Sequence, residues 1–303
     1  MPGSRFTLRP RGPYSLAASA RFLEAFAPAA HEAGPEGHLH LALPGPQDEP
    51  AGVCLRQEED GGAVLGEIFG GADPGFVRAE AQRILSLDHD AAGFAAVGER
   101  DPVVGRLQER FAGLRPVLFY SPYEAAAWAL IGHRIRIVQA AGVKARMAAE
   151  LGDPVDIHGD VRHAFPPPRR LAGLEAFPGL FGRKAEWLRA LGEAADAGAL
   201  DAAHLRSLPT DRALGELQGL PGIGPFSAEL ILLRGAGEAD HLPAAEPRLR
   251  RAVALAYGHE DEPTQAAVAQ RAERWRPYRT WVAVLLRAAL EEDTAEIAGR
   301  PRR

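Results

Sequence analysis

The sequence predicts an α+β fold in which a small antiparallel sheet domain is followed by an all-α body with two lobes. Short strand-like runs alternate with turn residues over residues 1–100. From Ser121 onward apolar residues recur with helical spacing, and short connections rich in Pro and Gly separate the helices. We therefore expect an N-terminal sheet domain over 1–112 and a helical domain over 113–303.

The first domain contains four runs with the composition of strands, at 6–10, 38–43, 52–57 and 63–69. Between the first two, residues 15–27 carry apolar side chains on one helical face. Turn residues separate the four runs, and antiparallel strands are the kind that short turns connect. This pattern favours an antiparallel sheet with at least one packed helix.

The second domain begins with a long helical pattern over 121–151. Ser121 is a candidate N-cap, Pro122 suits the first turn, and Glu124 completes a capping pattern. Gly132 is expected to divide this stretch into two helices. The further predicted helices are 169–176, 184–197, 210–217, 225–235, 247–257, 264–274 and 277–291.

The chain of 303 residues has a net charge of −5, and the acidic excess lies in its first third. Residues 1–110 hold 16 acidic and 10 basic side chains, whereas residues 111–303 hold 24 and 25. Arg clusters in the second part are either solvated helix faces or contact surfaces for a polyanion. These clusters lie at Arg169-Arg170, Arg183-Lys184, Arg248-Arg250-Arg251, Arg271-Arg274-Arg276-Arg279 and Arg300-Arg302-Arg303.

Composition also limits the cofactors and the compartment. Cys54 is the single cysteine, and on this count we expect the chain to have no internal disulfide, no thiolate zinc site and no cysteine-ligated iron–sulfur cluster. The apolar runs are shorter than the roughly 18 residues that a membrane span needs. The N-terminal residues lack the pattern of a signal peptide, so we expect a cytoplasmic protein without membrane association.

The most informative stretch is LQGLPGIGPFSAELILLRG at 217–235, where two predicted helices meet at a glycine turn. Gly222 and Gly224 are expected to turn the backbone with positive φ, and Ile223 between them can anchor the turn in the core. Amides at the start of the second helix then suit a phosphate oxygen. The alternative is an interhelical turn that binds nothing. The residues expected to meet a phosphate are Gly222, Ile223, Gly224, Phe226 and Ser227.

This stretch matches the helix-hairpin-helix motif L-P-G-[IV]-G-x-x-[ST]-A through Ala228, and three other stretches resemble the 3-methyladenine DNA glycosylase II family. They are 271–290 (its E-R-W-[KR]-P-[WY]-R helix), 129–146 (its A-[IL]-[IL]-G-Q helix) and 164–174 (its F-P-[TS]-P segment). The ordered matches span 115–291, and 6–100 shows a weaker likeness to the family's sheet domain.

The resemblance implies a two-lobed glycosylase body and a monofunctional DNA glycosylase of base excision repair that flips and hydrolytically releases alkylated purines. It also implies double-stranded DNA with damaged bases as the partner and a protein that acts as a monomer. No organic cofactor, metal or iron–sulfur cluster is implied, and a monovalent cation at the hairpin is left open. The alternative function is a non-catalytic binder of damaged or unusual DNA.

The same resemblance assigns the reacting carboxylate to Glu246, which stands where the family has Asp. Pro247 follows it, so we expect Glu246 at the N-cap of the next helix, where a carboxylate is stabilised. The competing interpretation is a purely structural cap. Asp240, slightly upstream, is either a second acid of the site or a brace of the loop.

Other family positions imply the reaction type and the DNA contacts. Phe226 occupies the position of the nucleophilic Lys of bifunctional relatives, which favours hydrolysis over lyase chemistry. His133 and Arg134 are placed to fill the gap left by the flipped base; Arg134 is otherwise a surface arginine. The implied base pocket consists of Phe226, Leu230, Trp281 and Arg287.

Overall fold

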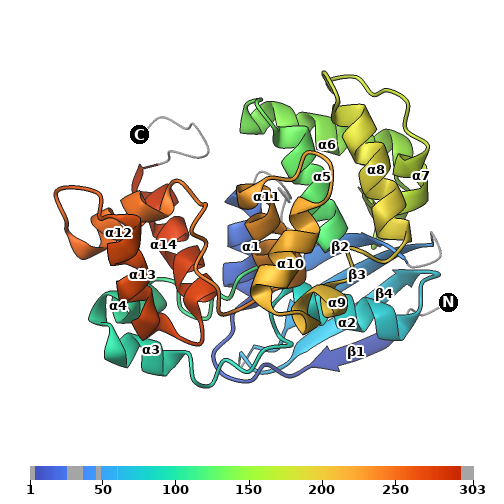
Figure 1. The fold of residues 1–303 in the computed structure, drawn as a ribbon. Helices are drawn as coiled ribbons and strands as arrows, with labels where there is room; N and C mark the ends of the chain where they lie inside the picture. The colour runs from blue at the N-terminus through green and yellow to red at the C-terminus, as the bar shows by residue number, and fades with distance from the viewer. Residues whose placement is uncertain (1–3, 26–36, 46–48, 60, 295–303) are drawn as a thin grey trace.

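The computed structural model describes residues 4–25, 37–45, 49–59 and 61–294 (Figure 1). A four-stranded sheet forms one side of the molecule, and two groups of helices lie over it and beside it. Each of the three parts has its own cluster of buried apolar side chains. The predicted α+β architecture is therefore confirmed.

The sheet consists of β1 (Arg5–Leu8), β2 (Leu39–Pro44), β3 (Pro50–Gln57) and β4 (Val64–Gly70). Its order is β1-β4-β3-β2 with antiparallel pairing throughout, so all four predicted strands are confirmed. One face packs against α1 (Leu16–Ala25) and α2 (Pro74–Ile84) through a core of leucine, valine and isoleucine side chains. The sequence analysis missed α2, although Asp73 caps it by accepting a hydrogen bond of 2.8 Å from the Phe76 amide.

A middle lobe contains most of the predicted helices, and its longest pair comes first. Ser121 caps the first helix by accepting a 3.0 Å hydrogen bond from the Glu124 amide, and the predicted break at Gly132 is confirmed. The helices are α5 (Pro122–Gly132), α6 (Ile137–Leu151), α7 (Pro168–Ala172), α8 (Lys184–Asp196), α9 (Ala202–Ser207), α10 (Thr210–Gln218) and α11 (Pro225–Leu230), which continues as the π-helical turn η3 (Ile231–Ala236).

A small hairpin between α6 and α7 was not predicted. It consists of β5 (Pro154–Ile157) and β6 (Asp160–His163), joined by His158 and Gly159 with φ values of 55° and 86°. Two residues with positive φ are what a tight hairpin turn requires. Val155 and Ile157 pack on the face of the main sheet opposite to α1 and α2, so the middle lobe reaches back over the sheet domain.

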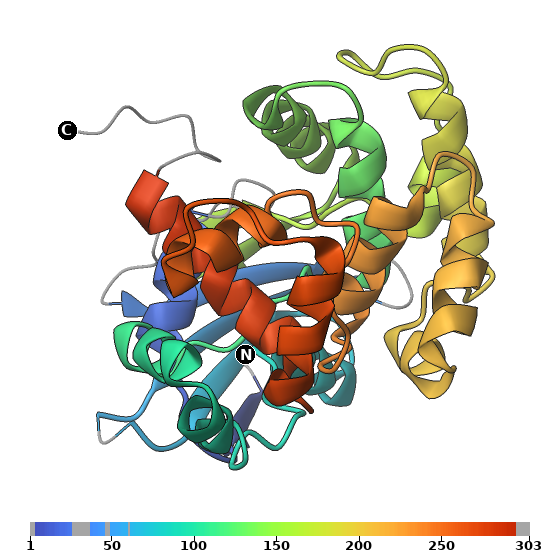
Figure 2. The same ribbon diagram turned by 60° about the vertical axis from the view of Figure 1, so that its left-hand side comes forward.

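The C-terminal lobe contains α12 (Leu249–Tyr257), α13 (Gln265–Ala272), the 3₁₀ turn η4 (Glu273–Trp275) and α14 (Arg279–Thr294). Two helices from the first domain, α3 (Ala95–Arg100) and α4 (Pro102–Arg110), share its core, and Figure 2 shows them beside it. Buried Asp101 links the two segments because it accepts hydrogen bonds from Tyr257 at 2.6 Å and Trp275 at 3.2 Å. The domain boundary at residue 112 stays a prediction, since this core combines residues from both sides of it.

In the described ranges, no helix combines the length and the apolar character that crossing a bilayer demands.

Candidate functional site

The glycine turn between α10 and α11 has one residue with positive φ, where two were expected. Gly222 has φ +83°, and a Cβ there would lie 2.7 Å from the Trp187 ring and 2.8 Å from Leu130. Gly224 has φ −97° and ψ −177°, which is extended backbone, and a Cβ there would meet open space. The prediction of positive φ at Gly224 is therefore wrong: one left-handed residue suffices to reverse the chain. Ile223 is 6% exposed and anchors the turn, as predicted.

The start of α11 presents backbone amides to solvent. Pro225 occupies the first helical turn, and the Ala228 amide is the first to donate within the helix, to the Gly224 carbonyl at 2.9 Å. The amides before it belong to the helix end that lacks internal acceptors. Phe226 is 44% exposed and Ser227 is half-buried. This end of α11 has the geometry that suits an anionic oxygen.

The turn between α5 and α6 lies beside the glycine turn, because both contact Trp187. The His133 ring packs edge-on at 5.8 Å from the Trp187 ring, under which Gly222 also sits. Arg134 is exposed and has φ +55°, which is strained for a residue with a side chain. The structure thus places both residues of the predicted wedge on an exposed, sharply bent turn next to the hairpin.

Lys184 supports this turn from inside the protein. Its ammonium group is buried and donates a 2.8 Å hydrogen bond to the Ile131 carbonyl at the end of α5. Burial lowers the pKa of this amine below its ordinary value. The sequence analysis counted Lys184 in a basic cluster; the structure makes it a helix cap that is inaccessible to a polyanion.

Glu246 lies in a turn that leads into α12, with its side chain 19% exposed. One carboxylate oxygen accepts a 3.0 Å hydrogen bond from the Arg248 amide, and the other lies 3.7 Å from Nε of Arg287. The helix begins at Leu249, so Glu246 precedes it by three residues and is not the N-cap that we predicted. The carboxylate is held in place by backbone and side chain and does not extend into bulk solvent.

Glu229 of α11 was not predicted as a site residue. It connects α11, the helix that follows the glycine turn, to residues 238–248, the acidic loop that carries Glu246. It is 8% exposed, and its two oxygens accept hydrogen bonds from the amides of Ala244 at 3.1 Å and Ala245 at 2.9 Å. A buried carboxylate costs free energy unless it is well hydrogen-bonded, and these amides supply that compensation. A lone acid in the apolar run 228–233 was the signal that could have revealed it.

Arg287, a member of the implied base pocket, lies beside Glu246. Arg287 is 19% exposed, and its charge together with burial lowers the pKa of the neighbouring Arg234 to about 10, burial being the larger cause. Arg234 donates a 2.6 Å hydrogen bond to the Val117 carbonyl. The Arg287 guanidinium thus places a positive charge beside the Glu246 carboxylate.

Of the predicted pocket residues, Trp281 is buried and Leu230 is half-buried. Trp281 is 2% exposed and packs against Phe94 at 5.3 Å and Tyr278 at 5.2 Å, so it belongs to the core of the C-terminal lobe, and its place in the base pocket stays a prediction. The apolar spacing along α14 turns this residue toward the lobe interior. Leu230 is half-buried against the core of the middle lobe.

Asp240 is a brace. Its carboxylate accepts hydrogen bonds of 2.9 Å from Arg276 and 2.9 Å from Arg279, and it also accepts from the Arg279 backbone amide at 3.3 Å. These contacts fasten the loop before Glu246 to the start of α14. Two members of the predicted basic cluster at 271–279 are therefore engaged inside the protein.

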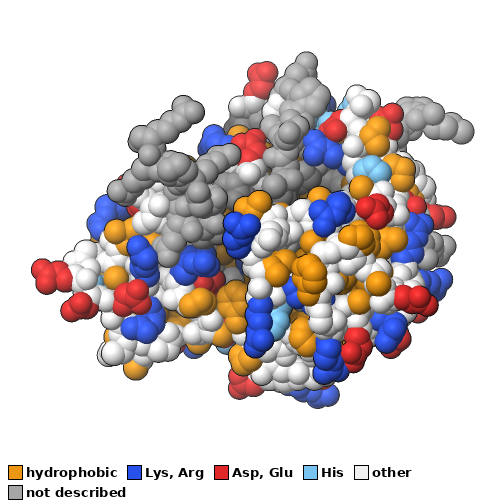
Figure 3. Space-filling model, turned by 90° about the horizontal axis from the view of Figure 1, so that it is seen from above, with side chains coloured by type: hydrophobic (Ala, Val, Ile, Leu, Met, Phe, Trp, Pro, Cys, Tyr) orange, Lys and Arg blue, Asp and Glu red, His pale blue; other side chains and the backbone are white. Residues whose placement is uncertain are grey.

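Several other arginines of the predicted clusters are also paired, but basic side chains remain on the face that carries the turns. Arg183 pairs with Glu186 at 2.6 Å and Arg170 with Asp153 at 2.9 Å. Seen from above, blue Lys and Arg side chains occur over both helical lobes (Figure 3). Arg300, Arg302 and Arg303 lie outside the described residues.

A cavity of about 500 Å³ lies elsewhere, between β1 and the segment 87–90. None of the predicted site residues lines it. The predicted site residues lie on two turns and a loop outside this cavity, with Glu246 on the loop.

Comparison with known proteins supports the resemblance that the motifs indicated. No family model matches the chain. It is 31% identical over 217 residues to the probable bifunctional transcriptional activator/DNA repair enzyme AlkA of Mycobacterium tuberculosis, covering 70% of this chain and 42% of that protein. It is 31% identical over 186 residues to DNA-3-methyladenine glycosylase 2 of Escherichia coli, covering 59% and 61%. The chain thus spans less than two thirds of the length of either relative.

A solved structure extends the comparison over almost the whole fold. The 3-methyladenine DNA-glycosylase from Archaeoglobus fulgidus matches with a TM-score of 0.78 at 22% identity. The match covers 96% of this chain and 99% of that one. The order of sheet and lobes is therefore shared as a complete fold.

Proposed function

We propose that this chain, which belongs to the helix-hairpin-helix DNA glycosylases as a divergent relative of the 3-methyladenine enzymes, releases alkylated purine bases from double-stranded DNA. One observation carries the proposal most directly. The Glu246 carboxylate is only 19% exposed, and α11 connects the loop that holds it to a turn suited to a phosphate. All these parts come from one chain, so a monomer suffices, and we expect it to act on DNA in the cytoplasm.

The proposed chemistry is hydrolysis of the bond between a damaged base and C1′ of its sugar. The nucleotide first leaves the base stack, which costs a few kcal/mol. As the bond breaks, its electron pair leaves with the base and positive charge develops on the sugar. The Glu246 carboxylate would stabilise this charge electrostatically. Water then adds to C1′ and loses a proton, which leaves an abasic site.

Hydrolysis is favoured over an amine-dependent reaction because the chain has few amines to offer. Phe226 stands where bifunctional relatives have Lys, and the sequence contains only two lysines. Lys184 is buried against the Ile131 carbonyl, and Lys144 is 2.5 Å from the carboxylate of Glu124 with 13% of its side chain exposed. Neither lysine is free to attack a sugar.

DNA contact is assigned to the two adjacent turns. Amides at the start of α11 would bind a phosphate of the backbone without reading sequence. Arg134, exposed on its bent turn, would fill the space left by the flipped nucleotide with a planar guanidinium. Binding of this kind weakens steeply as salt concentration rises.

The decisive experiment measures release of 3-methyladenine and 7-methylguanine from methylated duplex DNA by the wild type and by Glu246→Gln. Loss of one stabilising charge is expected to slow release by about 10²-fold or more while DNA affinity changes little. Exposed Glu260→Gln serves as the matched control and should behave as the wild type. Wild-type protein that binds the DNA but releases no base would favour the non-catalytic binder instead.

A further inference from the structure

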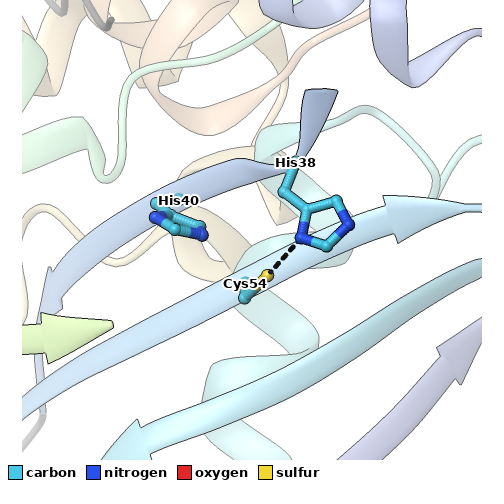
Figure 4. A group of neighbouring side chains, drawn as sticks. All are labelled: His38, His40 and Cys54. Atoms are coloured by element: carbon cyan, nitrogen blue, oxygen red, sulfur yellow. Dashed lines mark hydrogen bonds between the residues drawn. The ribbon is translucent and has the colours of Figure 1, made fainter. Parts of the chain in front are cut away.

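Three side chains with metal-binding atoms meet on the sheet face that lies away from α1 and α2. His40 of β2 and Cys54 of β3 are directly opposite partners in the antiparallel register, and His38 lies two residues before His40. Nδ1 of His38 is 3.4 Å from Sγ of Cys54, and one ligand atom from each residue lies within 4.8 Å of the others. Figure 4 shows both rings and the thiol gathered on this face. No part of the proposed DNA site includes them.

His40 carries the observation that points to a missing partner. Its side chain is 1% exposed, and Nδ1 lies 2.8 Å from the Asp160 carboxylate of β6. The other ring nitrogen, Nε2, is buried and has no hydrogen-bond partner among the described residues. A buried polar atom without a partner destabilises the folded state, because it has lost its hydrogen bonds to water. The His40 ring lies beside Cys54 and His38 (Figure 4), and one ligand atom of each residue lies within 4.8 Å of the others.

The Asp160 contact is the arrangement that supports metal-bound histidines. A carboxylate that accepts the proton of one ring nitrogen orients the ring and leaves the other nitrogen unprotonated for a metal. Arg162 in turn donates a 2.8 Å hydrogen bond to the same Asp160 oxygen, which fixes the carboxylate. The hairpin β5–β6 thus supplies the outer support for a ligand that belongs to the main sheet.

Two of these three side chains are buried, and the third is partly exposed to solvent. Cys54 is 4% exposed and packs with Val155 and Ile157 of the hairpin, while His38 remains half-buried. Burial, with a smaller contribution from Glu67, raises the pKa of the Cys54 thiol to about 11. In the metal-free protein the sulfur therefore carries its proton.

We propose that His38, His40 and Cys54 bind one zinc ion through Nδ1, Nε2 and Sγ, with a water molecule as the fourth ligand. A thiolate and two imidazoles select zinc over magnesium or calcium, which prefer oxygen ligands. Zinc displaces the thiol proton to solvent, and no electron is transferred. Nδ1 of His38 and Sγ of Cys54, at 3.4 Å, already have the separation of two ligands of one tetrahedral ion. Ligand atoms up to 4.8 Å apart must approach by about 1 Å to form bonds of about 2.0–2.3 Å.

Such an ion would act as a structural clip. It would join β2 to β3 directly and, through Asp160, join the sheet domain to the hairpin of the middle lobe. The single cysteine of the chain led us to expect no thiolate zinc site, because most structural sites use two or more. Here two imidazoles take the place of the missing thiolates. The inference does not depend on the proposed DNA chemistry, which uses other residues.

Full-length protein freed of metal with a chelator and then supplied with Zn²⁺ or Co²⁺ tests the site. Excess Zn²⁺ should raise Tm by about 5 °C, whereas Mg²⁺ should leave it unchanged. Co²⁺ should produce the thiolate-to-cobalt charge-transfer band of a sulfur-bound tetrahedral ion, in proportion to protein up to one ion per chain. Wild-type protein that shows neither the band nor a zinc-specific rise in Tm would overturn the proposal.

Variants then identify the ligands. Cys54→Ser should abolish the cobalt band and the zinc-dependent rise in Tm. His40→Gln should lower the affinity for Co²⁺ and for Zn²⁺ at least tenfold. Exposed His259→Gln lies in the C-terminal lobe and should retain both. A zinc-dependent rise that survives Cys54→Ser would place the ion elsewhere and refute the assignment. If a variant proves too unstable to purify, the cobalt spectrum of the wild type still decides the question.

Discussion

The glycine turn precedes α11 in the sequence and the loop that carries Glu246 follows its π-helical extension, and the two are built in different ways. The turn needs one left-handed glycine, a buried isoleucine and the free amides of a helix start. The acidic loop needs side chains from three separate segments: Glu229, Glu246 and Arg287. A turn that depends on backbone conformation can therefore be recognised from a few consecutive residues. A cluster of side chains from separate segments depends on how those segments pack.

Gly222→Ala would break the turn and is expected to have the largest effect on stability. The new Cβ would require φ +83° and would sit 2.7 Å from the Trp187 ring. We expect the free energy of unfolding to fall by about 3 kcal/mol and DNA binding to be lost together with it. Urea unfolding and a binding isotherm at fixed salt measure the two effects. A variant as stable as the wild type would show that the turn is not constrained as described.

Glu229→Gln would separate the acidic loop from the hairpin helix. The amide side chain can accept one of the two hydrogen bonds from Ala244 and Ala245, but its NH₂ group would face the other donor. We expect a loss of about 1–2 kcal/mol in unfolding free energy and a fall of about tenfold in the rate of base release. Exposed Glu150→Gln on α6 is the control. Unchanged release in Glu229→Gln would mean that the loop needs no support from α11.

Arg287→Gln should affect the Glu246 carboxylate and leave the glycine turn unchanged, because Arg287 contacts Glu246 and belongs to α14. Removal of a guanidinium 3.7 Å from the carboxylate should lower kcat about tenfold, with a smaller change in KM. Unfolding free energy should change by less than about 1 kcal/mol, since the pair is partly exposed. Steady-state kinetics with Arg189→Gln as the control distinguishes the two parameters. A change in KM alone would assign Arg287 to DNA binding.

Gly224→Ala should have the smallest effect, although the motif contains a glycine there too. Its backbone is extended and a Cβ would meet open space, so we expect a change below about 0.5 kcal/mol in unfolding free energy. DNA affinity is the sensitive measurement, since a methyl group here would stand between the backbone and a phosphate. Weaker binding at unchanged stability would show that this glycine is kept for the approach of DNA.

The sequence predicted the four strands of the main sheet, most helices and the two turns at residues 132–136 and 219–224 because each depends on local signals. Ser121, Gly132 and Ile223 act within a few residues of their partners, and the structure confirms them. The role of Glu229 and the placement of Trp281 could not be predicted, because both depend on residues distant in sequence. The β5–β6 hairpin escaped notice since its four-residue strands are too short to show a period.

The core that α3 and α4 share with residues 242–290 has a consequence for how the polypeptide matures. During synthesis these two helices emerge early, while the segments that will cover them are still untranslated. The sheet and the middle lobe can assemble first, because their clusters need nothing beyond Ala236. Val104 and Leu107 become buried only when α14 packs on them. A ribosome that stalls after residue 236 would therefore release a chain with an exposed apolar surface, which chaperones bind.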